Sequence, residues 1–128
     1  MTPNEYKILV VEDDRELLKL LEKKLLEVGY SVVAVASGQE ALDKTQSSMP
    51  HLILMDIMLP DIDGSEVVQK LKANPATQNI PIVFLSGIAA RVEGETRSEV
   101  KVGNRRFKAI PKPFTFAQLL SEIKIYLP

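Results

Sequence analysis

The stretch that decides the fold spans residues 52–64 and reads LILMDIMLPDIDG. Four apolar residues lead directly into Asp56, and a loop that carries Pro60 and Gly64 follows. A short, continuous apolar run bounded by turn residues is typical of a strand that is buried on both faces. An acid at the end of such a strand has a fixed backbone and an exposed carboxylate. This position suits a nucleophile or a metal ligand better than a solvated surface charge.

Outward from this stretch, predicted strands alternate with predicted helices. The strands are expected at residues 7–11, 30–35, 52–55 and 81–85, with a weaker fifth at 107–110. The helices are expected at residues 14–28, from Ser37 to about residue 46, around 67–71 and onward from Thr115; the second and last open on S/T-x-x-E/Q capping boxes. This alternation predicts an α/β fold, a doubly wound parallel sheet of five strands with helices on both faces. Because Pro111 has no N–H to donate, the fifth strand is expected at the edge of the sheet.

Composition limits the classes of protein that the chain can belong to. Its 128 residues, 45% hydrophobic and 26% charged, fit one globular domain, expected over residues 1–128 with an ordered core from about 6 to 127. The absence of cysteine excludes a disulfide scaffold, a thiolate zinc site and a cysteine nucleophile. A net charge of −1 gives no general attraction to nucleic acid or to an anionic membrane, and no apolar run could span a bilayer. We therefore expect a cytoplasmic protein.

Polar side chains follow the predicted strands at one common edge. The first strand leads into Glu12 and Asp13, the third into Asp56, the fourth into Ser86 and the fifth into Lys112. Ligands of doubly wound sheets bind at the carboxyl ends of the strands, so these side chains are expected to converge. Clustered carboxylates repel one another and should hold a cation, and oxygen ligands without cysteine or a nearby histidine favour Mg²⁺. A lysine and a hydroxyl beside them fit an aspartyl-phosphate site.

Other acids and the single histidine receive simpler interpretations. Asp14 is expected to favour the N-terminus of the first helix through its charge. Asp61 and Asp63 are expected as turn acids beside the metal site, because the positions around Gly64 do not fit a calcium loop. His51 lies at the opposite end of its strand from Asp56 and is expected to be a surface turn residue.

Four motifs in order make the chain resemble the receiver domain of two-component response regulators, as in the chemotaxis type. They are Val10-Val11-Glu12-Asp13-Asp14, then Met55-Asp56-Ile57-Met58-Leu59-Pro60 with Asp63-Gly64, then Leu85-Ser86-Gly87, and finally Lys112-Pro113-Phe114. The resemblance covers nearly the whole chain. It implies the flavodoxin-like strand order 2-1-3-4-5.

The resemblance also implies a role for each site residue. Asp56 would accept a phosphoryl group from the phosphohistidine of a histidine kinase or phosphotransfer protein. Ser86 would hydrogen-bond the phosphoryl group, Lys112 would pair first with Asp56 and then with a phosphoryl oxygen, and the Lys112–Pro113 bond would be cis. The Mg²⁺ ligands implied are Asp13 and Asp56 directly, the backbone carbonyl of Met58, and Glu12 through water. The chain would thus be a phosphorylation switch that acts on a downstream effector, not an enzyme.

The chain departs from the family between Ser86 and Lys112. Residues 87–106 are polar and a few residues longer than usual, so the fourth helix is expected to be short, displaced or mobile. An aromatic residue that reports phosphorylation in the family is replaced by Ala109, and we hypothesise that it is absent or has moved to Phe107. Met58 and Ile88 are apolar and would flank the phosphoryl group, which predicts slow self-dephosphorylation.

Two other functions remain open, and the arginines before the fifth strand do not indicate a nucleic-acid site. A phosphatase-like hydrolase would use Asp56 as its nucleophile, but it would want a second acid where Met58 stands. A receiver-like interaction module with an altered or phosphorylation-independent switch is the second alternative. The arginines at 91, 97, 105 and 106 alternate with acids and lack interleaved aromatic residues, which favours a mixed-charge surface over a nucleic-acid site.

Overall fold

The computed structural model describes residues 5–87 and 99–128. The strands within these ranges are β1 (Lys7–Val11), β2 (Ser31–Val35), β3 (Leu52–Asp56), β4 (Ile82–Ser86), β5 (Glu99–Val102) and β6 (Arg105–Pro111). The helices there are α1 (Arg15–Val28), α2 (Gly38–Ser48), α3 (Gly64–Ala73) and α4 (Phe116–Tyr126). None of these helices has the length and apolar character needed to cross a membrane.

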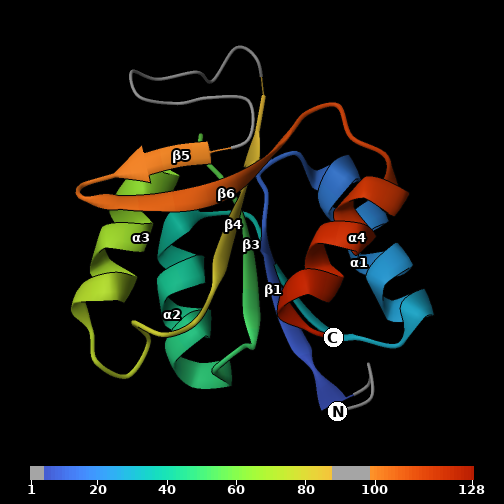
Figure 1. The fold of residues 1–128 in the computed structure, drawn as a ribbon, viewed down its shortest axis with the longest axis horizontal. Helices are drawn as coiled ribbons and strands as arrows, with labels where there is room; N and C mark the ends of the chain where they lie inside the picture. Colours follow the sequence, from blue (N-terminus) through green and yellow to red (C-terminus); the bar gives the residue numbers. More distant parts are fainter. Residues whose placement is uncertain (1–4, 88–98) are drawn as a thin grey trace.

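The strands form a single sheet in the order β2-β1-β3-β4-β6-β5 (Figure 1). Neighbours from β2 through to β6 are parallel, which confirms the predicted α/β doubly wound fold. The expected fifth strand is β6, and it lies beside β4 as the order 2-1-3-4-5 requires. In register, Asp56 lies opposite Leu85 and Ser86 lies opposite Pro111, so the carboxyl ends of three strands meet at one edge.

Two details of the predicted sheet are wrong. The sheet has six strands, because β5 pairs antiparallel with β6, and β6 is therefore not an edge strand. A two-residue turn joins them, with Gly103 at the positive φ of 60° that a tight hairpin needs. Pro111 is compatible with this position because the pairing with β5 ends at Lys108, three residues earlier, so its missing N–H removes no bond between β5 and β6.

The expected fourth helix has no counterpart among the described residues. Part of the segment predicted to hold it, residues 88–98, lies outside the described ranges. The part that follows forms β5 and the hairpin turn instead. The polar stretch that the sequence analysis interpreted as an altered helix thus includes a short strand whose residues alternate between charged and buried (Glu99, Val100, Lys101, Val102).

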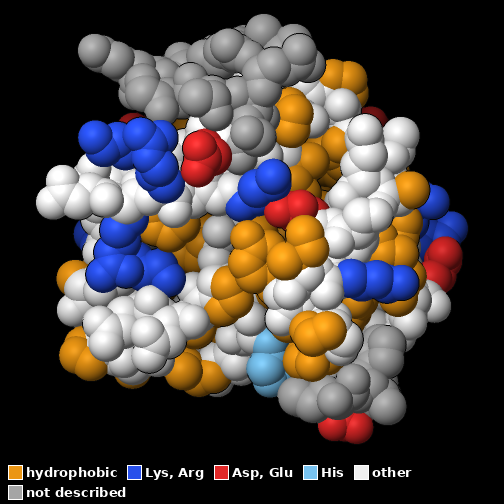
Figure 2. All heavy atoms as spheres, in the orientation of Figure 1, with side chains coloured by type: hydrophobic (Ala, Val, Ile, Leu, Met, Phe, Trp, Pro, Cys, Tyr) orange, Lys and Arg blue, Asp and Glu red, His pale blue; other side chains and the backbone are white. Residues whose placement is uncertain are grey.

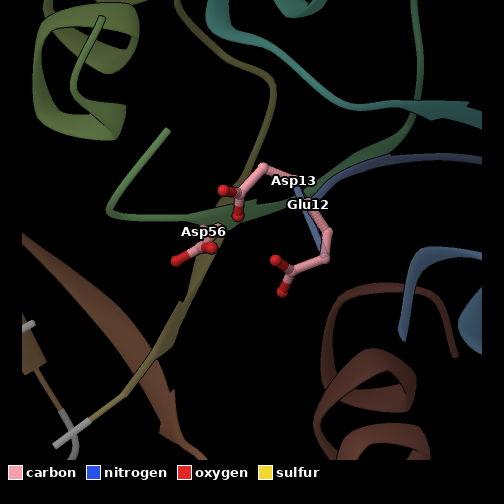
Figure 3. Close-up of side chains that lie close together, drawn as sticks. All are labelled: Glu12, Asp13 and Asp56. Atoms are coloured by element: carbon pink, nitrogen blue, oxygen red, sulfur yellow. The ribbon is translucent and has the colours of Figure 1, made fainter. Parts of the chain in front are cut away.

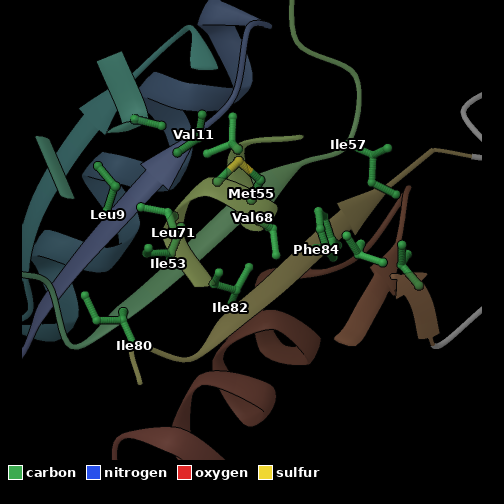
Figure 4. Packing of buried hydrophobic residues seen from close by; sticks show 14 of the residues in the cluster. Leu9, Val11, Ile53, Met55, Ile57, Val68, Leu71, Ile80, Ile82 and Phe84 are labelled. Carbon is green, nitrogen blue, oxygen red and sulfur yellow. The ribbon is translucent and has the colours of Figure 1, made fainter. Parts of the chain in front are cut away.

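Hydrophobic side chains pack on both faces of the sheet. One cluster lies between the sheet and the layer of α2 and α3, and it includes Val100 and Val102 of β5 (Figure 4). The second lies beneath α1 and α4 on the opposite face. Residues 52–55 are completely buried, as expected for a strand covered on both sides.

Helix ends follow the sequence signals closely. Asp14 caps α1 by accepting bonds from the N–H groups of Glu16 and Leu17, and Gly29 ends that helix at a φ of 115°. The capping box of Thr115 and Gln118 is complete at α4. At α2 the Ser37 hydroxyl accepts from the Glu40 N–H, while the Glu40 carboxylate accepts from that same hydroxyl. These caps fix where the loops at the edge of the sheet begin and end.

Candidate functional site

Three carboxylates meet at the carboxyl edge of the sheet (Figure 3). β1 ends at Val11, so Glu12 and Asp13 follow it directly, and β3 ends in Asp56 itself. One carboxylate oxygen from each of the three acids lies within 4.8 Å of the others. Glu12 is fully buried and Asp13 is exposed. Asp56 is only 6% exposed, so the expectation of an exposed carboxylate at the end of this strand is wrong. Two carboxylates of the cluster are thus buried, and the third is open to solvent.

Lys112 joins this cluster from the loop after β6. Its Nζ lies 2.5 Å from Glu12 Oε1 and 3.5 Å from Asp56 Oδ2. Its backbone N–H donates to the carbonyl of Ser86, and the peptide bond to Pro113 is cis, as predicted. The resemblance implied a pair between Lys112 and Asp56, but the closer partner is Glu12. The lysine therefore bridges two buried acids.

Glu12 is held at both carboxylate oxygens. Oε1 accepts from Lys112, and Oε2 accepts from the backbone N–H of Asp14 at 3.1 Å. The backbone N–H of Glu12 donates to Val35 of β2. A buried carboxylate without such partners would be strongly unfavourable, so these contacts explain how Glu12 remains in the core.

The electrostatics of the site favour a proton on Asp56. Burial raises the pKa of Asp56 to about 7, and a hydrogen bond to Glu12 and the charge of Glu12 act in the same direction. Lys112 and the Met58 N–H, which donates to Oδ1 at 3.3 Å, lower this pKa but do not outweigh burial. Burial alone would lower the pKa of Lys112, yet its bond to Glu12 and the charges of Asp56 and Glu12 raise it. The carboxylates compete for the single positive charge that Lys112 supplies.

The loop after β3 brings Gly64 against the site. Its N–H donates to the carbonyl of Ile57 at 2.7 Å. A Cβ on Gly64 would lie 2.5 Å from the backbone oxygen of Asp56 and 3.0 Å from the Cα of Ile57. Only glycine fits here without moving the backbone that carries Asp56.

Asp61 has a role that the sequence analysis missed. Its carboxylate accepts bonds from the N–H groups of Gly38 at 2.8 Å and Gln39 at 2.9 Å, at the start of α2. Bonds from Gln39 and Gly38 also lower the pKa of Asp61. In the described part of the chain, neither Asp61 nor Asp63 belongs to the carboxylate cluster. Asp61 therefore binds the start of α2 and does not contribute an oxygen to that cluster. The partners lie more than 20 residues apart in sequence, and no local pattern connects them.

The remaining predicted residues are distributed as follows. Ser86 is 4% exposed at the end of β4, on the same edge as the acids. Met58 is 57% exposed in the loop after Asp56. Ile88 lies outside the described residues. His51 is exposed and accepts from the Lys7 N–H through Nδ1, at the opposite end of β3, as expected for a surface turn residue.

The donor set fits a hard divalent cation. All three carboxylates offer oxygen, the chain contains no cysteine, and His51 lies at the other end of the strand. Mg²⁺ is usually bound through one or two carboxylates with several waters retained, which a cluster with one exposed acid permits. Glu12, Asp13 and Asp56 are therefore the residues of the described chain that can hold such an ion.

Comparisons with known proteins point to one family. The family model of the response regulator receiver domain matches residues 8–124. A "Probable transcriptional regulator ycf27" of Cyanophora paradoxa is 34% identical over 127 residues, which cover 99% of this chain and 50% of that protein. The "Polar-differentiation response regulator DivK" of Brucella ovis is 32% identical over 120 residues, which cover 94% of each chain. This chain thus spans about half the length of the first relative and nearly all of the second.

A solved structure agrees with these sequence matches. The receiver domain of the sensor histidine kinase PA1611 of Pseudomonas aeruginosa PAO1 has a TM-score of 0.81 and 28% identity, with 94% of this chain and 96% of that chain covered. That structure is described with a magnesium ion coordinated in its active-site cleft. The similarity extends over almost the entire chain on both sides.

Proposed function

This chain belongs to the family of response regulator receiver domains, and we propose that it is a phosphoacceptor switch whose acceptor is Asp56. The observation that carries the proposal is the convergence of Glu12, Asp13, Asp56 and Lys112 on one edge of the sheet. The proposed receiver domain extends over residues 1–128. Its proposed phosphodonor is the phosphohistidine of a histidine kinase or phosphotransfer protein.

In the proposed transfer, a carboxylate oxygen of Asp56 attacks phosphorus. The bond between phosphorus and the donor imidazole breaks, and its electron pair returns to that nitrogen. The new bond makes an acyl phosphate on Asp56. Strand β3 fixes the backbone of this acid, and the Met58 N–H orients its carboxylate, so little reorganisation is needed before attack.

The neighbours of Asp56 have separate proposed tasks. Lys112 moves from its shared position between two acids toward a phosphoryl oxygen, and Ser86 donates its hydroxyl to another. Asp13, Asp56, the Met58 carbonyl and, through water, Glu12 would hold Mg²⁺, which when bound neutralises charge on the transferring oxygens. Receiver domains act as phosphoacceptors, and no turnover of a free substrate is proposed.

Phosphorylation adds a charge of about −1.5 to −2 at this edge of the sheet. Lys112 then has a new anion to pair with, while its backbone remains bonded to Ser86 of β4. We propose that the loops after β3 and β4, with β6, shift between two arrangements in response. The downstream effector reads that shift.

The decisive experiment is mass spectrometry after incubation with acetyl phosphate and Mg²⁺. The wild-type chain should gain one phosphoryl group, and Asp56→Asn should gain none. Asp43→Asn, an exposed acid of α2, is the matched control and should behave as wild type. An adduct that persists in Asp56→Asn contradicts the assignment.

The same experiment separates the two alternatives. Steady phosphate release by the wild-type chain would favour a hydrolase. A folded chain that forms no adduct, even with a phosphorylated histidine kinase as donor, would favour an interaction module that does not use phosphate. For the phosphorylated form we propose slow decay, since Met58 is an apolar neighbour of Asp56. Loss of the adduct within seconds in Mg²⁺ would contradict slow decay but not the assignment of Asp56 as the phosphoacceptor.

A further inference from the structure

A groove lies between α3 and the β5–β6 hairpin. Its volume is about 280 Å³, below the range of about 300–1,000 Å³ that is usual for pockets holding drug-sized ligands. The lining residues are Val68, Gln69, Lys72, Val102, Gly103, Asn104, Arg105 and Phe107. The groove shares no residue with the carboxylate site. Its size suits one side chain of a peptide better than a cofactor.

The floor of the groove is apolar. Val68 and Val102 are buried, and the ring of Phe107 is half-buried. That ring meets Phe84 of β4 edge-on, with centroids 5.8 Å apart and an interplanar angle of 87°. Phe107 is therefore fixed in place while part of its ring faces the groove. A rigid aromatic floor offers an apolar side chain a contact that costs little conformational entropy.

The rim of the groove is positively charged. Lys72 donates to the carbonyls of Gln78 and Ile80, each at 2.8 Å, and its Nζ lies 5.9 Å from the centroid of the Phe107 ring. Burial and the charge of Arg105 both lower the pKa of Lys72, so the two cations lie close enough to interact. Among the described residues that line the groove, none is acidic. Figure 2 shows Lys and Arg side chains gathered over the tip of the hairpin and over α3, with hydrophobic surface between them.

Unlike Lys72 and Arg105, the cations on the opposite face of the hairpin have acidic partners within the described part of the chain. Arg106 lies 4.0 Å from Glu99, and Lys108 lies 3.9 Å from Glu122. Among the described residues, Lys72 and Arg105 have no carboxylate within 4.0 Å. Two cations that repel each other beside an apolar floor would gain from an external anion.

We propose that this groove binds an acidic peptide segment of a partner protein, with one apolar side chain on Phe107 and carboxylates paired with Arg105 and Lys72. Charge complementarity favours an acidic partner, and the apolar floor favours a peptide over nucleic acid. A nucleic-acid groove would need a longer cationic track and an open ring face for stacking, whereas the Phe107 ring is half-buried against Phe84. The proposal does not depend on phosphorylation of Asp56.

The test uses the whole ¹⁵N-labelled chain without phosphodonor. The probe is a short blocked peptide of glutamates around one central leucine, added at up to millimolar concentration. Amide shifts should concentrate at Val68, Gln69, Lys72, Gly103 and Asn104. A peptide with alanine in place of leucine should bind more weakly.

Two charge reversals on adjacent residues provide the matched pair. Arg105→Glu should weaken binding by about tenfold or more, the effect of losing one hydrogen bond between charged groups. Arg106→Glu makes the same change in net charge on the other face of β6 and should leave affinity within about twofold of wild type. Amide spectra of both variants confirm that they are folded.

Three outcomes would overturn the proposal. The first is a peptide that shifts no groove resonance in the wild-type chain. The second is equal loss of affinity in Arg105→Glu and Arg106→Glu, since that indicates general charge attraction. The third is a single-stranded oligonucleotide that binds the groove more tightly than the peptide does, which would identify a nucleic-acid site. None of these depends on whether Asp56 accepts phosphate.

Discussion

Glu12, Asp13 and Asp56 compete for the single positive charge that Lys112 supplies. The pKa of Asp56, raised to about 7 mainly by burial, lies far above the usual 3.8. The folded chain therefore binds this proton more tightly than the unfolded chain does. The resulting contribution to stability is present below about pH 4 and is lost as the pH rises to about 7. In neutral, metal-free solution Asp56 therefore opposes folding.

Asp56→Asn should consequently stabilise the metal-free chain at pH 8. The expected gain in the free energy of unfolding is about 2–4 kcal/mol, from roughly 1.4 kcal/mol per unit of pKa shift. At pH 4 the gain should almost vanish, because wild-type Asp56 is then protonated. Urea unfolding at both pH values measures this, with Asp43→Asn as an exposed control. A gain that is the same at pH 4 and pH 8 would contradict the raised pKa.

Lys112→Met should destabilise the chain by about 2–4 kcal/mol, because it leaves buried Glu12 and Asp56 without their shared cation. Acid should restore part of this loss by protonating the carboxylates. Lys108→Met removes an exposed lysine from its long, 3.9 Å pair with half-buried Glu122 and should cost no more than about 1 kcal/mol. Equal losses in the two variants, measured by urea unfolding, would refute the bridging role of Lys112.

The convergence of these residues could be predicted from sequence because each follows a recognisable apolar strand. The parallel sheet then brings the strand ends together without further information. The closer pairing of Lys112 with Glu12 could not be predicted, because it depends on side-chain distances between residues 100 positions apart. The same holds for the contact of Asp61 with the start of α2.

At the scale of elements, continuous apolar runs located β1 to β4 to within about one residue, because burial on both faces leaves a clear pattern. Capping residues placed the starts of α1 and α4 equally well. The hairpin escaped prediction because β5 is short and half charged. Such a strand depends on its pairing with β6 and on its contact with α3, and α3 is distant from β5 in sequence.

The loop between β3 and α3 gives a prediction at this scale. Gly64→Ala should lower the free energy of unfolding by about 2 kcal/mol, because its Cβ would press on the backbone of Asp56 and Ile57. Phosphorylation by acetyl phosphate should also slow as Asp56 moves. Gly87→Ala is the stability control, since a Cβ there meets no atom of residues 5–87 or 99–128 within 4 Å. If both variants unfold at the same urea concentration, the close approach of the backbone at Gly64 does not explain a loss of stability.

Across the whole molecule, the sheet separates two cores, and Phe107 belongs to the one beneath α2 and α3. It shares this face with Ala109, as the regular strand predicted. Its edge-on contact with Phe84 links the hairpin to β4, the strand that ends in Ser86. We propose this contact as the route by which a change near Ser86 reaches the hairpin, with Phe107 as the displaced aromatic switch.

Phe107→Ala should therefore interrupt the response of the hairpin. In the wild-type chain we expect acetyl phosphate with Mg²⁺ to shift amide resonances of β5 and β6, and in Phe107→Ala these shifts should fall to a small fraction. The variant should also lose about 1–3 kcal/mol of stability, since the ring is half-buried. Phe116→Ala removes a half-buried ring from the other core and should keep the hairpin shifts. Wild-type shifts in Phe107→Ala would exclude the displaced switch.

The antiparallel pairing of β5 has a consequence for how the chain opens. Its partners on β6 lie between three and nine residues away in sequence, whereas β1 and β3 pair residues 44 positions apart. β5 can therefore separate and re-form without breaking any parallel pair, at the cost of a few hydrogen bonds and the burial of two valines. We therefore expect the amide protons of β5 to exchange with solvent before those of the central strands.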